Sequence, residues 1–103
     1  MATAPSEPTP GISLDGVRWM HRRGVALYAG DISDAHPALD PAVPGPLHRI
    51  ALPRLGMPLI DAADVNELAI ACAERNRYSF LLSIAPPRIN GLTGIPVNPM
   101  AIF

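Results

Sequence analysis

Histidine and aspartate side chains are the groups of this chain that could transfer protons or bind a metal ion. His21 falls on the polar side of a predicted helix, and His36 precedes a proline in a predicted loop. Neither has a carboxylate or a cysteine at the spacing of a metal motif, so both are expected in solvent. His48 differs, because it stands before an apolar segment and Asp61 ends the next predicted strand. The fold can therefore bring an imidazole and a carboxylate together at His48 and Asp61.

The pair of His48 and Asp61 has two interpretations. As a site, it offers a nitrogen and an oxygen ligand to a divalent metal, and His48 could also shuttle a proton. As ordinary surface residues, the two side chains need no function, and most such pairs are of this kind. A catalytic metal takes about three protein ligands and a water molecule, so the pair alone predicts only part of a centre.

Several catalytic motifs with fixed spacing are absent from the sequence. It has no glycine-rich phosphate loop with its lysine, no paired Cys-x-x-Cys, no His-Glu-x-x-His and no Gly-x-Ser-x-Gly. The lone cysteine, Cys72, shares a predicted helical face with Val65 and Leu68, where a thiol packs as a small apolar group. Trp19 and Tyr28 are likewise expected in the core or in an interface.

Composition limits the partners and the compartment. The formal charge of -1 and the pI of about 6.2 provide no basic surface for a nucleic-acid backbone. Polar residues recur too often for a membrane span, the single cysteine excludes an internal disulfide, and the first residues lack the apolar region of a signal peptide. We therefore expect a soluble, cytoplasmic protein. An apolar fraction of 49% in 103 residues also suggests that a partner covers part of the surface.

Hydrophobic periodicity predicts an α/β protein with two helices and a small mixed sheet. Ser13 caps a helix over 14–23, and Asp64 begins a capping box for a helix over 64–75. Between strand candidates, the segment 47–56 mixes a helical pattern with a proline. Apolar runs predict strands over 25–29, 57–60, 78–85 and 96–103. The run at 78–85 is continuous, which predicts burial on both faces.

The chain is expected to form one domain after a proline-rich arm. Residues 1–11 hold three prolines among small polar residues, a composition that does not bury enough area to offset the entropy of ordering. They are predicted to be flexible, and residues 12–103 form the domain. A long loop over 30–46 lies inside it, and loops of this length are usually functional or reach toward another surface.

The segment GLTGIPVNP, residues 91–99, is predicted to form a rigid turn that delivers the closing strand. Gly91 and Gly94 permit a tight backbone, and Pro96 and Pro99 set its exit. The strand can close the sheet or lie against another subunit. The functional alternative is that Thr93 and the backbone amides of the turn contact a substrate.

Several of these segments occur in an order that resembles a known family. The cues are H-R-I-A-L at 48–52, A-C-A-E-R at 71–75, two prolines after a strand, and G-x-T-G-x-P-V-N-P at 91–99. Together they resemble the C-terminal part of the cyclase family of metal-dependent hydrolases, which includes kynurenine formamidase, an arylformamidase, and isatin hydrolase. The earlier stretch GISLDGVRWMHRRGVALYAGD also looks like that family, in which a helix leads into a strand.

The resemblance implies a partial β/β/α swivelling-type domain, oligomeric in the family, in which a divalent metal activates water against an amide. Zinc or manganese would suit this reaction, and the family's place is in tryptophan catabolism. It also implies His48 as a metal ligand or proton shuttle and Asp61 as a metal ligand. The family's first ligands lie in His-x-Gly-Thr-His-x-Asp, which this sequence lacks. The acid is usually glutamate in kynurenine formamidases, and DAADVNEL departs from their Glu-Asn-Leu pattern.

Two hypotheses follow from the sequence. In the first, the chain is the C-terminal part of a hydrolase of small amides such as N-formylkynurenine, and it is inactive alone because the metal-binding half is truncated, encoded elsewhere or lost. Its partners would be a complementary N-terminal chain or further copies of itself. In the second, the chain is a non-catalytic assembly module whose apolar surface pairs with itself or with another chain.

Overall fold

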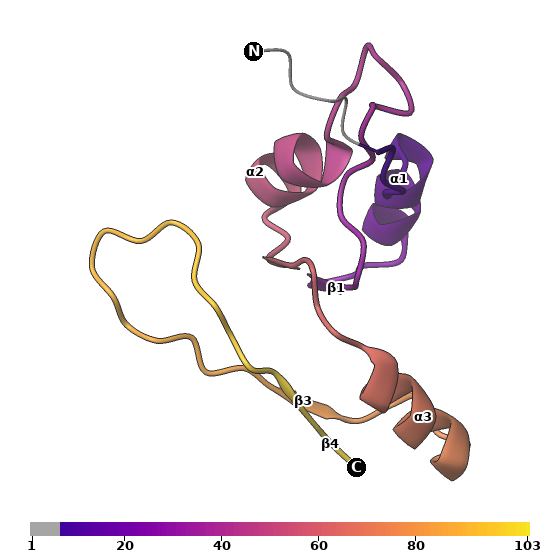
Figure 1. Cartoon of the computed structure of the whole chain (residues 1–103), viewed down its shortest axis with the longest axis vertical. Coiled ribbons are helices and arrows are strands. Elements are labelled where there is room, and N and C mark those ends of the chain that lie inside the picture. The colour runs from indigo at the N-terminus through magenta and orange to yellow at the C-terminus, as the bar shows by residue number, and fades with distance from the viewer. Residues whose placement is uncertain (1–6) are drawn as a thin grey trace. The chain divides into compact units, whose positions relative to one another are not determined.

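The structure is a computed structural model that describes residues 7–103, and its chain divides into two compact units. The first unit ends at Val65 and the second is Asn66–Phe103. The first unit holds the elements α1 (Leu14–Arg22), β1 (Tyr28–Ala29), η1 (Leu47–Ala51), α2 (Leu52–Leu55) and β2 (Leu59–Ile60) (Figure 1). The second holds α3 (Asn66–Arg75), β3 (Leu81–Ser83) and β4 (Met100–Ile102). The predicted α/β class is confirmed.

The strands of residues 7–103 form two separate sheets, each of two strands, rather than one mixed sheet. β1 pairs with β2 in parallel, with Tyr28 opposite Leu59. β3 pairs with β4 in the antiparallel direction. Both pairs are shorter than the predicted apolar runs, because only two or three residues of each run have a partner strand in this part of the chain.

Helix α1 begins where the sequence predicts and ends one residue earlier, at Arg22. The Ser13 hydroxyl accepts a hydrogen bond from the Gly16 amide at 3.0 Å, which satisfies one of the free N–H groups of the first turn. Gly24 follows the helix with a φ of 68°, a left-handed conformation that a side chain disfavours. His21 and Arg22 lie in the last turn, where positive charge complements the carbonyl end of the helix.

A further helical segment fills residues 47–55. Its first part, η1, is a π turn in which the Leu52 amide bonds to the Leu47 carbonyl, and α2 continues from it. Pro53 has no amide hydrogen, so it cannot make the ordinary helical bond. The wider π turn accommodates the helix ahead of this proline, and Gly56 ends the segment with a φ of 64°. Because of this proline, the sequence did not yield a definite prediction for the segment 47–56.

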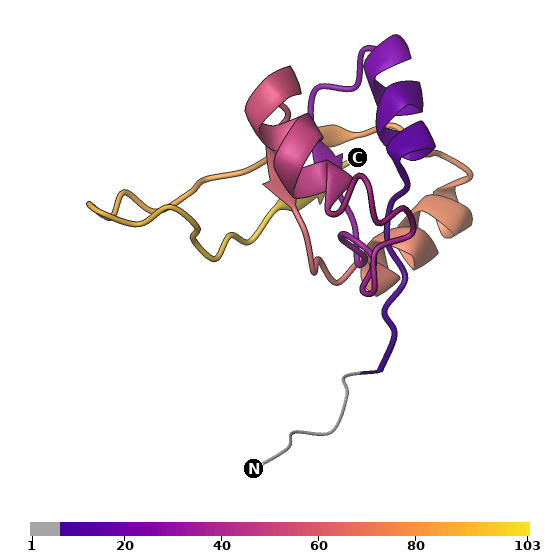
Figure 2. The same ribbon diagram turned by 90° about the horizontal axis from the view of Figure 1, so that it is seen from above.

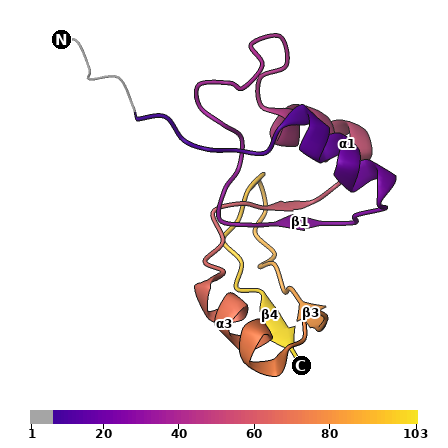
Figure 3. The ribbon, with the colours of Figure 1, turned by 90° about the vertical axis from the view of Figure 1, so that its right-hand side faces the viewer.

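The core of the first unit lies between the helices and β1. It consists of buried apolar side chains from α1, from η1 and from the turn before β2: Val17, Met20, Leu47, Ala51 and Met57. Figure 2 shows α1 beside the segment that contains η1 and α2, and the two segments are in contact. Figure 3 shows both on the same side of β1. Trp19 is exposed instead and lies against the Arg23 guanidinium, 5.5 Å from the ring centroid, so it is not a core residue and its alternative place in an interface stays a prediction.

The second unit has little buried apolar surface. Cys72 of α3 is buried, as predicted, and it is a free thiol. The prediction that the run over 78–85 is buried on both faces is wrong, since Leu81 and Leu82 are exposed. A continuous apolar run is typical of a strand between two layers, but the described residues supply no second layer here.

The end of the predicted flexible arm is held in place. Residues 1–6 of that arm lie outside the described residues. The Thr9 amide donates to the His36 carbonyl at 2.7 Å, and the His36 amide donates back to the Thr9 carbonyl at 3.1 Å. Gly11 bridges Ser33, and a Cβ on Gly11 would lie 1.9 Å from the Ala35 nitrogen. Residues 9–11 of the predicted arm therefore pair with the loop over 30–46, and the flexibility of the arm stays a prediction.

Within residues 7–103, every helix is too short or too polar to reach across a lipid bilayer.

Candidate functional site

His48 lies between the carboxylates of two aspartates. Its Nδ1 is 2.7 Å from Asp34 Oδ2, and its Nε2 is 3.0 Å from Asp61 Oδ2. The structure therefore brings His48 and Asp61 together and adds Asp34. The imidazole is half exposed (48%), Asp61 is 38% exposed and Asp34 is 14% exposed, so the Asp34 side of the ring is more covered than the Asp61 side.

Asp34 fixes the start of the helix that carries His48. Its Oδ1 accepts the Leu47 amide at 2.8 Å, and its Oδ2 accepts the His48 amide at 3.1 Å. These amides are at the free N-terminal end of η1, where a carboxylate is favoured. The same carboxylate thus holds both the backbone and the ring of His48. Gly45, beside this carboxylate, has a φ of 61°, a left-handed conformation that a side chain disfavours.

Asp61 comes directly after β2 and is held from the long loop. The Ser33 hydroxyl donates to Asp61 Oδ2 at 3.1 Å, and this is the same oxygen that faces His48 Nε2. Ser33 and Asp34 are neighbours in the chain, so one part of the loop over 30–46 reaches both ends of the cluster. Long loops of this kind are usually functional or reach toward another surface, and this loop contacts both ends of the cluster within the first unit.

Tyr28 of β1 lies near these carboxylates. Its hydroxyl donates to the Ile32 carbonyl at 2.5 Å. Burial raises the pKa of Tyr28, and the negative charges of Asp31, Asp61 and Asp34 raise it further. The phenol therefore stays neutral beside a locally acidic cluster. The prediction of a core or interface position for Tyr28 corresponds to its half-buried place against the core cluster.

The cluster offers part of the donor set of a metal site. Metal-bound histidines usually donate their second ring N–H to a carboxylate, and Asp34 is placed for this at Nδ1. His48 Nε2 and Asp61 Oδ2 would then be the ligand atoms, which are types that zinc and manganese accept. No group of three histidine, cysteine, aspartate or glutamate side chains within residues 7–103 is arranged to hold a metal ion. The residues fit a metal in type, but not in number.

The other predicted site residue, Thr93, belongs to the second unit. It is exposed in the segment between β3 and β4, after Gly91 with its φ of 82°. The cluster around His48 is built within the first unit and does not include it. His21 and His36 are exposed, as expected.

Sequence reasoning missed Asp34 and Ser33. Local capping rules search the few residues before a helix, whereas Asp34 caps η1 from 13 residues upstream. The available signal was indirect: the helix after Pro46 has no capping side chain of its own. The unpaired amides therefore required a capping group from a distant loop, but they did not determine which residue supplies it.

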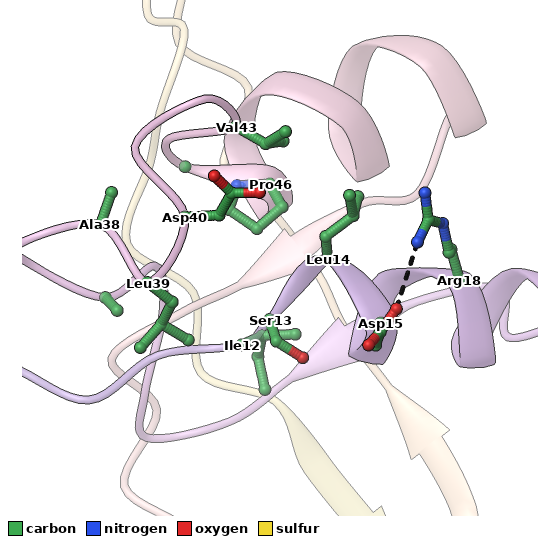
Figure 4. Close-up of a pocket in the computed structure, with 12 residues that line it drawn as sticks. Ile12, Ser13, Leu14, Asp15, Arg18, Ala38, Leu39, Asp40, Val43 and Pro46 are labelled. Carbon is green, nitrogen blue, oxygen red and sulfur yellow. Dashed lines mark hydrogen bonds and ion pairs between the residues drawn. The ribbon is translucent and has the colours of Figure 1, made fainter.

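A separate pocket of about 270 Å³ lies between the N-terminal end of α1 and the loop over 35–46 (Figure 4). Apolar side chains line much of it, including Leu14, Leu39 and Val43. Asp15 and Arg18 also line it, and they form an ion pair of 3.2 Å. The lining does not include His48 or its two carboxylates, so this hollow is not the cavity of the candidate site.

The chain matches no protein-family profile, no curated protein and no solved structure at a significant level. The resemblance to the cyclase family therefore depends on the sequence cues quoted above.

Proposed function

We propose that this chain supplies the His48 and Asp61 part of a metal-dependent hydrolytic centre of the cyclase-family type. The observation that supports this most is the position of His48 between two carboxylates. Asp34 holds the covered Nδ1 side at 2.7 Å, and Nε2 points to Asp61 on the more open side. An imidazole oriented in this way presents one defined nitrogen to a metal ion or to a proton.

The proposed substrate is a small amide of the formamide class, such as N-formylkynurenine, as the resemblance to the arylformamidases suggests. A bound zinc or manganese ion would supply activation of water for attack on the carbonyl. His48 Nε2 and Asp61 Oδ2 would hold the ion, and Asp34 would keep the imidazole in place. Because such a centre takes about three protein ligands, the remaining donors come from outside residues 7–103, for example from a complementary chain. On this proposal the isolated chain does not hydrolyse amides.

The test is a calorimetric titration of the purified chain with Zn²⁺ or Mn²⁺. We expect weak, saturable binding of one ion per chain that His48→Ala abolishes. His21→Ala is the matched control, because His21 is an exposed histidine away from the cluster, and it should bind as the wild type does. Equal binding by wild type and His48→Ala would overturn the proposal, and so would hydrolysis of a formamide by the isolated chain at an enzymatic rate.

A second candidate function is favoured by the exposed apolar residues of the second unit. These include Leu81, Leu82, Met100 and Ile102 on its two strands. On this reading the chain is an assembly module without catalysis. A metal-free, stable oligomer whose metal titration shows no dependence on His48 would support this function over the hydrolytic one.

A further inference from the structure

The register of β3 and β4 divides their side chains between two faces. Leu81 lies opposite Ile102, and Ser83 lies opposite Met100. Because side chains alternate along a strand, these four residues share one face. Leu82 lies opposite Ala101, and this pair points to the other face.

The two faces differ in what covers them. Phe80 and Phe103 extend the face of Leu82 by the same alternation, and their rings pack at 5.4 Å. The Arg75 guanidinium of α3 lies 4.7 Å from the Phe103 ring centroid, so the end of α3 contacts this face at Phe103. On the opposite face, Leu81, Met100 and Ile102 are 66%, 54% and 48% exposed. That face is apolar and uncovered.

The two outer edges of this sheet also differ. Pro96 and Pro99 precede β4 and have no amide hydrogen to donate, which weakens that edge for further pairing. The segment 79–85 around β3 contains no proline and no charged residue. Within residues 7–103, β3 has β4 as its only partner strand. Edge strands in proteins that stay monomeric are usually protected by lysine, proline or a covering segment, and within the described residues the segment 79–85 has no lysine, no proline and no second partner strand.

We propose that the outer edge of β3 pairs with β3 of a second copy of this chain, in the antiparallel direction about a twofold axis at Leu82. The segment suits itself as a partner. Between Tyr78 and Phe103 the only charged side chain is Arg88, so two copies bring almost no like charge together. The pairing makes a four-stranded sheet, continues the exposed apolar face across the axis, and places Leu82 opposite the same residue of the second copy. This proposal does not depend on the hydrolytic one.

The experiment is sedimentation equilibrium of the full chain over a range of concentrations, with Leu82→Lys as the test variant. We expect a dimer whose dissociation constant rises by about tenfold or more in the variant, because two lysines would meet at the axis. Leu92→Lys is the matched control. Leu92 is also an exposed apolar residue (51%, against 41% for Leu82), but it lies in the connection between the strands, and its variant should dimerise as the wild type does.

Hydrogen exchange gives a second readout that does not need the variant to fold. The amides of β3 should gain protection as the wild-type concentration rises. A wild-type monomer at all concentrations would overturn the proposal, as would unchanged dimerisation of a folded Leu82→Lys or β3 amides that exchange equally fast in dimer and monomer. Metal titration of Leu82→Lys separates the two proposals, because His48 lies in the first unit and should bind as before.

Discussion

At the scale of single residues, Asp34 joins the long loop to the helix start in the candidate site. It accepts the amides of Leu47 and His48 and faces the His48 ring, so loop, helix start and imidazole meet at one carboxylate. Carboxylates that satisfy several donors in a partly buried place are costly to remove, because the donors then lose both water and partner. The stability of this part of the chain and the orientation of the candidate site are therefore linked.

We expect Asp34→Ala to lower the free energy of unfolding by about 2–3 kcal/mol, because the amides of Leu47 and His48 are left without an acceptor. Asp34→Asn should lose less, since it retains an acceptor oxygen. Urea unfolding followed by circular dichroism measures both. Asp40→Ala is the control, because that exposed carboxylate accepts the Ala42 amide through one oxygen and is not part of the His48 cluster. Equal losses at positions 34 and 40 would contradict the assigned role.

Tyr28 gives a prediction about pH. Its pKa is raised above the ordinary value of 10.0 by burial, and then by the charges of neighbouring carboxylates. As the pH rises above this ordinary pKa, the unfolded chain loses its phenolic proton before the folded chain does. The folded state then binds more protons, so stability falls as pH rises. Urea unfolding from pH 10 upward should show this slope, and Tyr28→Phe should reduce it. The exposed Tyr78 provides the control, and a slope that Tyr78→Phe alone reduces would refute the assignment.

The sequence predicted one pair of side chains in the candidate site, but not the whole site. His48 and Asp61 could be paired from the order of the predicted elements, since each stands at the boundary of an apolar segment. Asp34 and Ser33 could not, because their partners lie 13 to 28 residues away and the loop between has no periodicity. Contacts of this kind depend on the path of the loop, which local patterns do not determine.

At the scale of elements, local signals located α1 and α3, with α3 beginning at Asn66 and not at Asp64, and located the strands only in part. The Ser13 cap and the glycine after α1 are contacts within a few residues, and these were predictable. The strands needed partners from elsewhere, so their lengths followed the pairing and not the apolar runs. The π turn before Pro53 also lay beyond the sequence patterns, since the proline there signals only a break.

The pairing of residues 9–11 with the loop predicts a strong effect of a small substitution. In Gly11→Ala the new Cβ would meet the backbone of Ala35, so the pairing must open or shift, and we expect a loss of about 1–3 kcal/mol in unfolding free energy. Gly94→Ala is the matched control, because nothing lies within 4 Å of a Cβ there. Thermal unfolding of both variants checks this. A Gly11→Ala variant as stable as Gly94→Ala would show that the close approach is not needed.

At the scale of the whole molecule, the two units differ in how much apolar surface they bury. The buried core residues of the described chain are Val17, Met20, Leu47, Ala51, Met57 and Cys72, and only the last belongs to the second unit. The hydrophobic effect therefore stabilises the first unit far more. The high apolar fraction of the sequence had suggested a covered surface, and the exposed strands of the second unit are where such a cover would act.

This difference predicts unequal local stability. In dilute solution, amides of Asn66–Phe103 should exchange with solvent well before those around the core of the first unit, which hydrogen exchange with mass spectrometry resolves. Leu47→Ala should cost about 3 kcal/mol in the first unit, because Leu47 is fully buried. Exchange that is uniform over the two units would contradict the prediction.

The π turn of η1 has a consequence for the length of the chain at this place. A π turn holds one more residue than an α turn, so deleting one residue between Leu47 and Leu52 would leave ordinary α winding and keep the following residues on nearly the same face. Leu47 and Ala51 would then be three residues apart, which still places both on one face of the helix. The segment should therefore accept the loss of one exposed residue, such as Arg49, more readily than truncation of the buried Leu47.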